Sequence, residues 1–389
     1  MSPRAVVLKP GREKPLIRRH PWIFSGAVDS FPSFTDGEIL PVLSIHGEFL
    51  AQAFFHSERS LVGRVLTFEE EPFHDALRRR FQEAYALRKR LFSPDTDSFR
   101  LIHAEGDGLP GLIVDLFNDV AVMQFNTLGM WRLKEVLVEL LKELVHPRAV
   151  YEKSLSTVRA LEGLQECREF LWGEASEEIT IQENGIRYIV NYQSGQKTGF
   201  YLDQRRMRGL IAGMAKNLRV LNCFSYSGGF SLSSLKGGAA HVTSVDSSKE
   251  ALSLCRRNTE LNGFPLEKHT LLQEDLFTFL KSAPLDYDLI ILDPPALAKR
   301  KGSILNACRA YKELNRSVFQ KAPPGSYLLT CSCTGVITPS LFQDLIAQAA
   351  AEEKREVRIL SCHLDSFDHP HSLFHPEGRY LKSLLLYLS

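Results

Sequence analysis

The sequence contains no apolar run that approaches the roughly 18 residues needed to span a membrane. Its first residues, 1–9, have only a short apolar stretch and lack the apolar core of a secretory signal peptide. Low-complexity tracts and long internal repeats are also absent. A net charge of only +1 gives no bulk electrostatic reason to expect a nucleic-acid partner. These absences favour a globular, cytoplasmic protein that does not associate with membranes.

The cysteines are few and odd in number. Seven of them are scattered between Cys167 and Cys362, which argues against a disulfide framework and for free thiols in a reducing compartment. Cys331 and Cys333 are separated by a single residue and lack a matching second pair, whereas zinc sites use two pairs at wider spacing. We therefore expect no metal site in this chain.

Length and local pattern predict three domains. A chain of 389 residues is too long for one ordinary core. Residues 1–70 contain short strand-like runs broken by Gly and Pro, which favour a small β barrel. Residues 71–195 mix strands and helices without βαβ alternation, which favours a central α+β domain. Over residues 196–389 strands and helices alternate, and about seven strands are recognisable, which predicts a doubly wound, Rossmann-like α/β sheet.

Three local patterns are specific enough to predict single elements. Residues 73–92 have helical periodicity, with aromatic and aliphatic side chains on one face. Residues 98–126 predict a hairpin around Gly106–Gly111. Asn184-Gly185, between two apolar runs, predicts a second hairpin with a tight turn.

Basic residues gather at two places. The first twenty residues carry six Lys or Arg against one Glu, and the predicted helix carries the triplets Arg78–Arg80 and Arg88–Arg90. Basic faces of this kind contact phosphate, although many solvated helix faces have the same composition. We expect RNA contact at the N-terminal cluster, whereas the helix leaves both interpretations open.

The segment Val220–Phe230 is an apolar run that stops at a turn containing Gly228 and Gly229. Glycine lets the backbone approach a ligand where a side chain would collide, and a helix that begins there offers free N–H groups. A tight strand-to-helix turn without a ligand would use the same glycine pair. The residues expected to line a ligand at this turn are Asn222, Phe224, Ser225, Tyr226 and Gly228.

Acidic residues end the next two predicted strands. Asp246, followed by Ser247, is placed to accept hydrogen bonds from both hydroxyls of a ribose. Asp275, followed by Leu276, is placed to bind an adenine amino group; the alternative is that it caps the next helix. The full Gly-x-Gly-x-x-Gly fingerprint of NAD-binding folds is absent. The pattern therefore indicates S-adenosylmethionine (SAM) as the cofactor.

A further apolar strand, Leu289–Leu292, ends at Asp293 and two prolines. Successive prolines fix an extended turn without N–H donors, so the Asp293 carboxylate and the backbone carbonyls face a substrate base. Enzymes that methylate exocyclic amines usually place an aromatic residue directly after such a turn, to stack on the base. This chain has Ala296 there, which weakens amine methylation without excluding it.

The next predicted strand ends at Cys331-Ser-Cys333, across the crevice from Asp293. A cysteine at this position is a candidate nucleophile. Cytosine C5 is not nucleophilic enough to attack SAM, but addition of a thiolate to C6 turns C5 into an enamine-like carbon that accepts a methyl group. Asp293 would hold N3 and the exocyclic amine of the base. The alternative is that both cysteines are small buried residues of a strand.

Five motifs along the chain match one family of enzymes. They are His20–Gly26, Glu105–Asp115, Lys197–Arg205, Asn222–Phe230, and Asp368-His-Pro370 with Pro376–Lys382. Together they resemble the bacterial 23S rRNA (cytosine-5) methyltransferases over essentially the whole chain. The resemblance implies an RNA-binding PUA β barrel, a central α+β domain and a Rossmann-like SAM methyltransferase domain. It also implies ribosomal RNA, or a ribosomal subunit precursor, as the partner, and a homodimer.

The same resemblance implies roles for single residues. The segment Lys197–Arg205 would fold over the cofactor, with Phe200 and Asp203 near the adenosine or the methionine. The family's Ser-Cys-Ser/Thr element matches Cys333, which makes it the implied nucleophile in preference to Cys331. One departure concerns the second cysteine that many RNA cytosine-5 enzymes carry after the Asp-Pro turn, since this chain has proline there. The modified base is therefore less firmly predicted than the use of SAM.

Three functions follow from these observations. The leading hypothesis is SAM-dependent methylation of ribosomal RNA at cytosine C5, with Cys333 as nucleophile and Asp293 holding the base. The second is SAM-dependent amine methylation of an RNA purine, in which Asp293 is the main catalytic residue and the cysteines are bystanders. The third is a non-catalytic, RNA-binding ribosome assembly factor that retains a vestigial cofactor fold.

Overall fold

The computed structural model describes residues 4–155, 157–298 and 301–389. Residues 1–3 lie outside these ranges; they belong to the segment 1–9, for which no signal peptide is predicted. The chain folds as two compact units. The first contains Met1–Ile181, Val190–Leu202 and Phe367–Gly378, and the second contains Gln182–Ile189, Asp203–Ser366 and Arg379–Ser389. In the described ranges, no helix is both long and apolar enough to cross a membrane. The division into three sequence domains remains a prediction.

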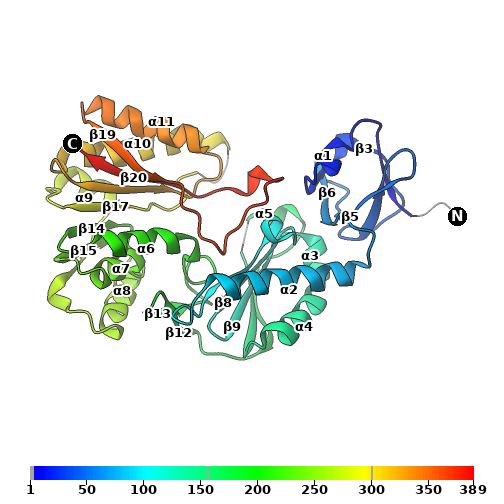
Figure 1. Cartoon of the computed structure of the whole chain (residues 1–389), viewed down its shortest axis with the longest axis horizontal. Helices are drawn as coiled ribbons and strands as arrows, with labels where there is room; N and C mark the ends of the chain where they lie inside the picture. The colour runs from blue at the N-terminus through cyan, green and yellow to red at the C-terminus, as the bar shows by residue number, and fades with distance from the viewer. Residues whose placement is uncertain (1–3, 156, 299–300) are drawn as a thin grey trace. The chain divides into compact units, whose positions relative to one another are not determined.

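The first unit begins with a six-stranded sheet (Figure 1), arranged β2-β6-β5-β4-β1-β3. Its strands are β1 (Val6–Leu8), β2 (Trp22–Phe24), β3 (Val28–Ser30), β4 (Ile39–Leu43), β5 (Phe49–Phe55) and β6 (Leu61–Thr67). A short helix, α1 (Lys14–Ile17), lies between β1 and β2 in the sequence. Alternate side chains of β4 are buried, because successive residues of a strand point to opposite faces. The buried side chains form an apolar core of their own.

A second sheet of the same unit has five strands in the order β11-β10-β9-β8-β7. They are β7 (Phe99–His103), β8 (Leu112–Phe117), β9 (Val120–Phe125), β10 (Ala149–Ser154) and β11 (Cys167–Gly173). The helices around it are α2 (Phe73–Leu91), α3 (Leu128–Arg132), α4 (Lys134–Val145) and α5 (Thr157–Leu161). The helix predicted over residues 73–92 and the hairpin around Gly106–Gly111 are confirmed as α2 and β7–β8.

The sequence shows no βαβ alternation in this part of the chain, and its otherwise antiparallel sheet contains one βαβ unit. β9 and β10 are parallel neighbours, and α3 and α4 connect them. β10 is hard to recognise in the sequence because Glu152 and Lys153 are charged, although both are buried. Glu152 pairs with Arg159 at 2.9 Å, and Lys153 donates to the carbonyl of Gly195 at 2.5 Å. Specific polar partners thus allow a charged strand to lie in the interior.

A two-stranded sheet follows, formed by β12 (Glu178–Glu183) and β13 (Ile186–Asn191). It confirms the hairpin predicted from Asn184-Gly185. Both turn residues have a positive φ, 49° at Asn184 and 69° at Gly185. A two-residue type I′ turn requires this conformation at both positions, which is why the Asn-Gly pair predicted it.

A buried ion-pair cluster ties the end of β12 to α6 (Arg205–Met214). The carboxylate of Glu183 lies 2.9 Å from Nε of Arg205 and 2.6 Å from Nε of Arg208. All three side chains are almost fully buried. The two guanidinium groups lower the pKa of Glu183 below its ordinary value, against the opposing effect of burial, which alone would raise it.

The second unit is built on the predicted seven-stranded sheet (Figure 1), in the order β16-β15-β14-β17-β18-β20-β19. Its strands are β14 (Arg219–Cys223), β15 (His241–Asp246), β16 (His269–Gln273), β17 (Leu289–Leu292), β18 (Tyr327–Ser332), β19 (Val357–Cys362) and β20 (Lys382–Leu388). Its further helices are α7 (Gly229–Lys236), α8 (Lys249–Leu261), α9 (Leu276–Ser282), α10 (Ile304–Lys321) and α11 (Pro339–Glu352). β14 to β18 are parallel, and β20 is antiparallel to both of its neighbours. The strand order reverses at β14, and open α/β sheets bind ligands at the carboxyl ends beside such a reversal.

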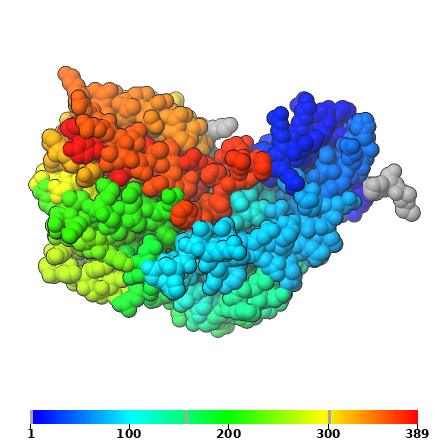
Figure 2. All heavy atoms as spheres, viewed as in Figure 1, coloured from blue at the N-terminus to red at the C-terminus, as the bar shows by residue number. Residues whose placement is uncertain are grey.

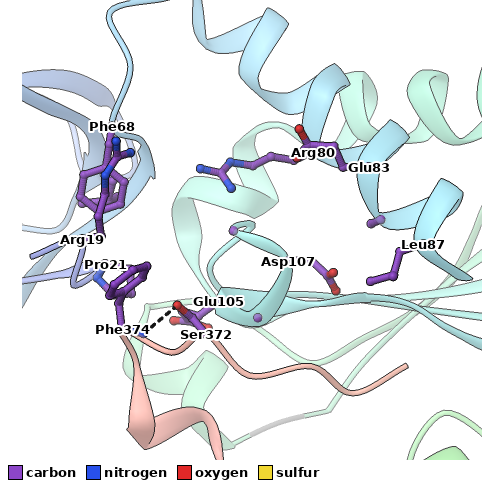
Figure 3. A pocket seen from close by; sticks show the side chains of 14 residues that line it. Arg19, Pro21, Phe68, Arg80, Glu83, Leu87, Glu105, Asp107, Ser372 and Phe374 are labelled. Carbon is purple, nitrogen blue, oxygen red and sulfur yellow. Dashed lines mark hydrogen bonds between the residues drawn. The ribbon is translucent and has the colours of Figure 1, made fainter. Parts of the chain in front are cut away.

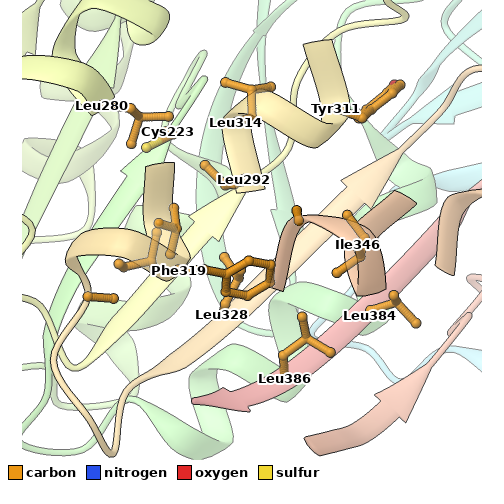
Figure 4. Close-up of a cluster of buried hydrophobic side chains, with 14 of the residues drawn as sticks. Cys223, Leu280, Leu292, Tyr311, Leu314, Phe319, Leu328, Ile346, Leu384 and Leu386 are labelled. Atoms are coloured by element: carbon orange, nitrogen blue, oxygen red, sulfur yellow. The ribbon is translucent and has the colours of Figure 1, made fainter. Parts of the chain in front are cut away.

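Helices cover both faces of this sheet, so its central strand β17 is apolar and buried on both sides. On one face α9, α10 and α11 contribute Leu280, Phe319 and Ile346 to a core with the strands (Figure 4). On the other face α6 and α7 form a separate core. Consecutive residues of β17 alternate between the two, with Ile290 in the first core and Ile291 in the second. This double coverage leaves the strand ends as the place where polar groups can gather.

The segment Phe367–Gly378, which we call the strap, lies between β19 and β20 in the sequence but belongs to the first unit. Its Asp368 is fully buried and accepts a hydrogen bond from the backbone N–H of Arg100 at 3.0 Å. Its His375 packs edge-on against Trp22, with ring centroids 4.5 Å apart. Figure 2 shows orange-red atoms of the strap beside blue and cyan atoms of the same unit. A C-terminal segment thus completes the N-terminal unit.

Candidate active site

The glycine turn at the carboxyl end of β14 is conformationally strained. Phe224, Tyr226 and Gly228 have φ values of 59°, 46° and 87°. A positive φ costs a non-glycine residue on the order of 1–3 kcal/mol and persists only where the surrounding structure imposes it. A Cβ atom on Gly228 would lie 2.5 Å from the sulfur of Cys255, so glycine is required there. Such strain is typical of ligand sites, and no sequence pattern signalled it at Phe224 or Tyr226.

Asp246 ends β15 and faces this turn. One carboxylate oxygen accepts the backbone N–H of Tyr226 at 2.8 Å, and the other accepts that of Ser248 at 2.9 Å. The side chain is half-buried, and the neighbouring Ser247 is exposed. Each carboxylate oxygen has a second lone pair, so these bonds leave acceptor capacity for ribose hydroxyls. That contact remains a prediction.

Asp275 and Leu276 lie at the start of α9. One oxygen of Asp275 accepts the backbone N–H of Thr278 at 2.9 Å and its hydroxyl at 3.0 Å, so the alternative interpretation as a helix cap is confirmed. The hydrogen bond from this backbone N–H lowers the pKa of Asp275 below its ordinary value. The carboxylate is exposed and Leu276 is buried in the core. A contact of either residue with adenosine stays a prediction.

Three buried polar atoms, two after or within the end of β14 and one in the turn before α6, have no hydrogen-bond partner among the described residues. They are Oδ1 of Asn222, Oγ of Ser225 and Oε1 of Gln204. Buried polar atoms are normally paired, and Asn222 is held in place because its Nδ2 donates to Ser231 at 2.8 Å. A ligand with amino and hydroxyl donors would supply the missing partners. SAM carries both kinds of group, so the site fits this cofactor.

Phe200 and Asp203 belong to different units of the chain. Phe200 is buried in the first unit. Asp203 is buried in the second unit, where its Oδ2 accepts a hydrogen bond from the hydroxyl of Tyr380 at 2.6 Å. Tyr380 directly precedes β20 in the chain, so this bond connects the segment before α6 with the last strand of the sheet. The roles of Phe200 and Asp203 toward the cofactor remain predictions.

A thiol and a carboxylate lie at adjacent strand ends. Asp293 follows β17 and accepts a hydrogen bond from Nε2 of Gln204 at 2.8 Å. Cys333 follows β18, the parallel neighbour of β17, and its sulfur lies 3.9 Å from the carbonyl oxygen of Pro294. Both side chains are half-buried. The two parallel strands therefore bring Cys333 to the turn that carries Asp293.

The two cysteines of this strand differ in burial. Cys331 is fully buried within β18, in the core that α6 and α7 cover. Burial raises the pKa of its thiol well above the ordinary value, whereas a nucleophile reacts as the thiolate. Cys333 lies beyond the end of the strand and is half-buried. This difference favours Cys333 over Cys331 as the nucleophile, and its reactivity remains to be measured.

Lys382, for which no role was predicted, lies beside Cys333. It pairs across the sheet with Ser332 and is only 1% exposed. Its ammonium donates to the carbonyl oxygens of Thr334 at 2.7 Å and of Tyr380 at 2.5 Å. Burial lowers the pKa of Lys382 to about 8. Lysines with such a lowered pKa are concentrated at functional sites, and only the position of Lys382 at the end of a family motif pointed to it in the sequence.

Two family profiles and several known sequences match this chain. The profile of the S-adenosylmethionine-dependent methyltransferases matches residues 157–364, and that of a PUA-like domain matches residues 6–68. The chain is 39% identical to the ribosomal RNA large subunit methyltransferase I of Aeromonas salmonicida, and the match covers 98% of each sequence. The protein of the same name from Aliivibrio fischeri is 40% identical, over 97% of this chain and 98% of its own length.

Solved structures agree with the sequence comparison. A SAM-dependent methyltransferase from Streptococcus mutans has a TM-score of 0.83 at 25% identity, covering 98% of this chain and 99% of that chain. A methyltransferase complexed with SAH has a TM-score of 0.85 at 26% identity, covering 99% and 100%. The predicted fold class and the predicted use of SAM are therefore confirmed. The chain belongs to the S-adenosylmethionine-dependent methyltransferases and, among these, to the family of ribosomal RNA large subunit methyltransferase I.

Proposed function

We propose that this protein transfers a methyl group from SAM to C5 of a cytosine in large-subunit ribosomal RNA. The observation that carries the proposal is the position of Cys333 beside the Asp293 turn, at the ends of two adjacent parallel strands. The relatives that cover nearly the whole chain are named ribosomal RNA large subunit methyltransferases, which supports ribosomal RNA as the substrate.

In the proposed mechanism Cys333 is the nucleophile. Its thiolate adds to C6 of the cytosine. The electron pair of the C5–C6 double bond is displaced onto C5 and delocalised through C4 to N3, which makes C5 nucleophilic. Asp293 holds N3 and the exocyclic amine and so orients the base for this addition. SAM, when bound, supplies an electrophilic methyl group. Once C5 is methylated, a water molecule takes the C5 proton. The electron pair of that C–H bond restores the C5–C6 double bond, while the C6–S bond breaks and its electron pair leaves with the sulfur as the thiolate.

Residues at the other strand ends hold the cofactor in this proposal. Asp246 accepts hydrogen bonds from the ribose, and Asp275 binds the adenine amino group. The open acceptors of Asn222 and Ser225 receive donors of the cofactor, and Asp203 lies near its adenosine or methionine portion. Together with the strained turn after β14, these groups fix the cofactor without the glycine fingerprint of NAD-binding folds.

The first experiment measures transfer of labelled methyl groups from SAM to large-subunit ribosomal RNA that lacks the modification. We expect nucleoside mass analysis to place the label in 5-methylcytidine. Asp246→Ala should weaken SAM binding about tenfold or more, because charge-assisted hydrogen bonds to the ribose are lost. Glu250→Ala, which removes an exposed acid from α8, is the matched control and should bind SAM normally.

The other outcomes distinguish the remaining hypotheses. Label in a methylated purine would replace the Cys333 mechanism by amine methylation centred on Asp293. SAM binding without any transfer, to protein-free RNA or to ribosomal subunit precursors, would favour a non-catalytic assembly factor.

We also propose that the protein works as a homodimer in the cytoplasm. The seven cysteines are free thiols, which supports a reducing compartment. The dimer follows only from the resemblance to the family, and sedimentation at several protein concentrations would test it. A single monomeric species at every concentration would contradict it.

A further inference from the structure

A cavity of about 370 Å³ lies within the first unit, among the N-terminal sheet, α2, the loop Glu105–Gly108 and the strap (Figure 3). Arg19 and Phe68 line it from the N-terminal part, Arg80 from α2, and Phe374 from the strap. In Figure 3 the guanidinium of Arg80 extends from α2 toward the side on which Arg19 and Phe68 lie. Two cationic groups and two aromatic rings therefore border one cavity.

Arg80 differs from its neighbours on α2. Arg78 and Arg79 each pair with a carboxylate, at 2.5 and 2.6 Å. Arg80 is half-buried and its Nε donates to the carbonyl oxygen of Leu66 at 3.0 Å. No carboxylate pairs with it, and its terminal nitrogens have no partner, among the residues that the structure describes. Burial, with the charge of Arg79, lowers the pKa of Arg80 below its ordinary value, and the charges of Glu83 and Glu71 oppose this shift only in part.

The carboxylates around the cavity already have partners. Asp107 accepts two hydrogen bonds from Arg88, at 2.6 and 2.7 Å. Glu105 accepts the indole N–H of Trp22 at 3.0 Å, and Glu83 lies 3.5 Å from a neighbouring arginine. These pairings leave Arg80 without a carboxylate in direct contact in the described ranges, although Glu83 and Glu71 lie near enough to act on its charge. An anion that presents several oxygens is the ligand that a free guanidinium edge favours.

Two glycines shape the wall of the cavity. A Cβ atom on Gly108, which has a φ of 70°, would lie 1.9 Å from Nη1 of Arg80. A Cβ atom on Gly106 would lie 1.9 Å from the carbonyl oxygen of Pro370 in the strap. Glycine at both positions therefore lets Arg80 and the strap approach the loop closely. The Arg80 side chain is held at this wall by the hydrogen bond from its Nε to the carbonyl oxygen of Leu66.

We propose that this cavity binds one phosphate of the substrate RNA between Arg80 and Arg19, with an adjoining base stacked on Phe374. Arg80 offers free terminal nitrogens to the phosphate oxygens. Arg19 is held over the ring of Phe68, 5.2 Å from its centroid, and its Nη1 pairs with Glu69 at 3.0 Å, so the unpaired guanidinium edge of the site comes from Arg80. Phe374 is 50% exposed and offers a ring face of the kind on which unpaired bases stack. The inference rests on the proposed RNA substrate and adds a contact remote in sequence from the methyl-transfer residues.

The test compares Arg80→Gln with Arg78→Gln. Both remove one positive charge from α2, but Arg78 does not line the cavity. For Arg80→Gln we expect about a tenfold loss of affinity for an unmodified large-subunit ribosomal RNA transcript, since one charged contact is removed. The slope of log affinity against log salt should fall by about 0.7 to 0.9 for the lost phosphate contact. Equal losses in the two variants, or no loss in Arg80→Gln, would overturn the proposal.

A second measurement uses the unaltered protein and covers the case in which Arg80→Gln lowers the melting temperature. RNA should slow hydrogen exchange of the backbone amides in Glu105–Gly108 and in the strap near Phe374. Protection elsewhere in the chain but not at these two places would rule the site out. Because both measurements follow binding without SAM, a failure of methyl transfer leaves them interpretable.

A separate observation concerns Lys382. Its buried ammonium holds the carbonyl of Thr334, directly after Cys333, and no carboxylate pairs with it in the described part of the chain. We infer that Lys382 is a positioning residue that stabilises the thiolate of Cys333 and fixes the turn that carries it. The inference rests on the proposed role of Cys333. Titratable groups also act on Cys333 from neighbouring elements, among them Asp293, Cys331 and Tyr311. Near Lys382 itself lie His363 and Tyr380.

The test follows alkylation of Cys333 by iodoacetamide as a function of pH, with peptide mass analysis to isolate this cysteine. Lys382→Met should raise the pH of half-maximal rate by about one to three units, because a nearby opposite charge is lost. Lys382→Arg keeps the charge and should stay close to the original midpoint. If the Met variant does not fold, Lys382→Gln takes its place.

An unchanged midpoint in the Met or Gln variant would refute this role of Lys382. A folded Arg variant with the shifted midpoint would refute it equally, because the charge is then not the cause. The assay contains no RNA and no SAM, so it separates this inference from the proposed methyl transfer.

Discussion

Replacing Cys333 by alanine is expected to lower methyl transfer roughly a thousandfold or more while leaving SAM binding unchanged. The thiolate is the only group in the proposed mechanism that can activate C5, and alanine cannot replace it. The side chain is half-buried and its sulfur lies 3.9 Å from the Pro294 carbonyl oxygen, a weak contact, and alanine removes only the sulfur atom. Single-turnover transfer to ribosomal RNA, together with a SAM binding isotherm, measures both effects.

Cys331→Ala is the matched control. It removes the same atom two residues earlier in the chain, at a buried position within β18, and should retain near-normal turnover. RNA with 5-fluorocytosine at the target should form a covalent adduct with the unaltered protein and not with Cys333→Ala, since fluorine cannot leave as a proton does. Near-normal turnover of Cys333→Ala would contradict the thiolate mechanism and leave Asp293 as the main catalytic residue.

Replacing Glu183 by glutamine is expected to destabilise the second unit by about 3–5 kcal/mol, because two buried guanidinium groups lose their shared carboxylate. The nearest contacts are 2.6 Å to Arg208 and 2.9 Å to Arg205, and all three side chains are almost fully buried. The melting temperature of this unit should fall by roughly 10 °C. Glu274→Gln changes an exposed glutamate of the same unit in the same way and should have little effect.

The pH dependence of the stability difference between the unaltered protein and Glu183→Gln tests whether the ion pairs cause it. The pKa of Glu183 is lowered in the folded protein from its ordinary value of 4.5. Its contribution to stability is therefore fully present above about pH 4.5 and is lost as the pH falls through the lower, folded-state pKa. The stability gap between the unaltered protein and Glu183→Gln should narrow on acidification below that pH. A gap that stays constant would show that the ion pairs are not its cause.

Most of the second unit was predictable because its information is local. Apolar runs that stop at Asp246, Asp293 and the cysteine pair predict parallel strands whose ends meet at one edge. Once seven strands and their connecting helices are recognised, few arrangements remain. The same logic predicted the hairpin at Asn184-Gly185, since the turn conformation is encoded in those two residues.

The features that escaped prediction depend on contacts between distant parts of the chain. β10 is charged and becomes a buried strand only because Arg159 and Gly195 supply partners. Arg88 belongs to a basic triplet that suggested RNA contact, yet it is fully buried and bonded to Asp107. Lys382 became a candidate only when the sheet placed it opposite Ser332. Composition and periodicity do not reveal which residues distant in the sequence contact each other in the folded chain.

The place of β20 in the sheet has a consequence for the order in which the protein can fold during synthesis. β20 lies between β18 and β19 and pairs with both, so the edge of β18 stays open until residues up to Leu388 have left the ribosome. The first unit also cannot complete its fold until the strap has been synthesised, because Asp368 of the strap fills its interior and forms hydrogen bonds with Arg88 and Arg100. A nascent chain that stalls shortly before this point exposes an unpaired, apolar strand edge, which is a template for aggregation. Both units therefore complete their folding only when the C-terminal segment has been synthesised, at nearly the same stage of translation.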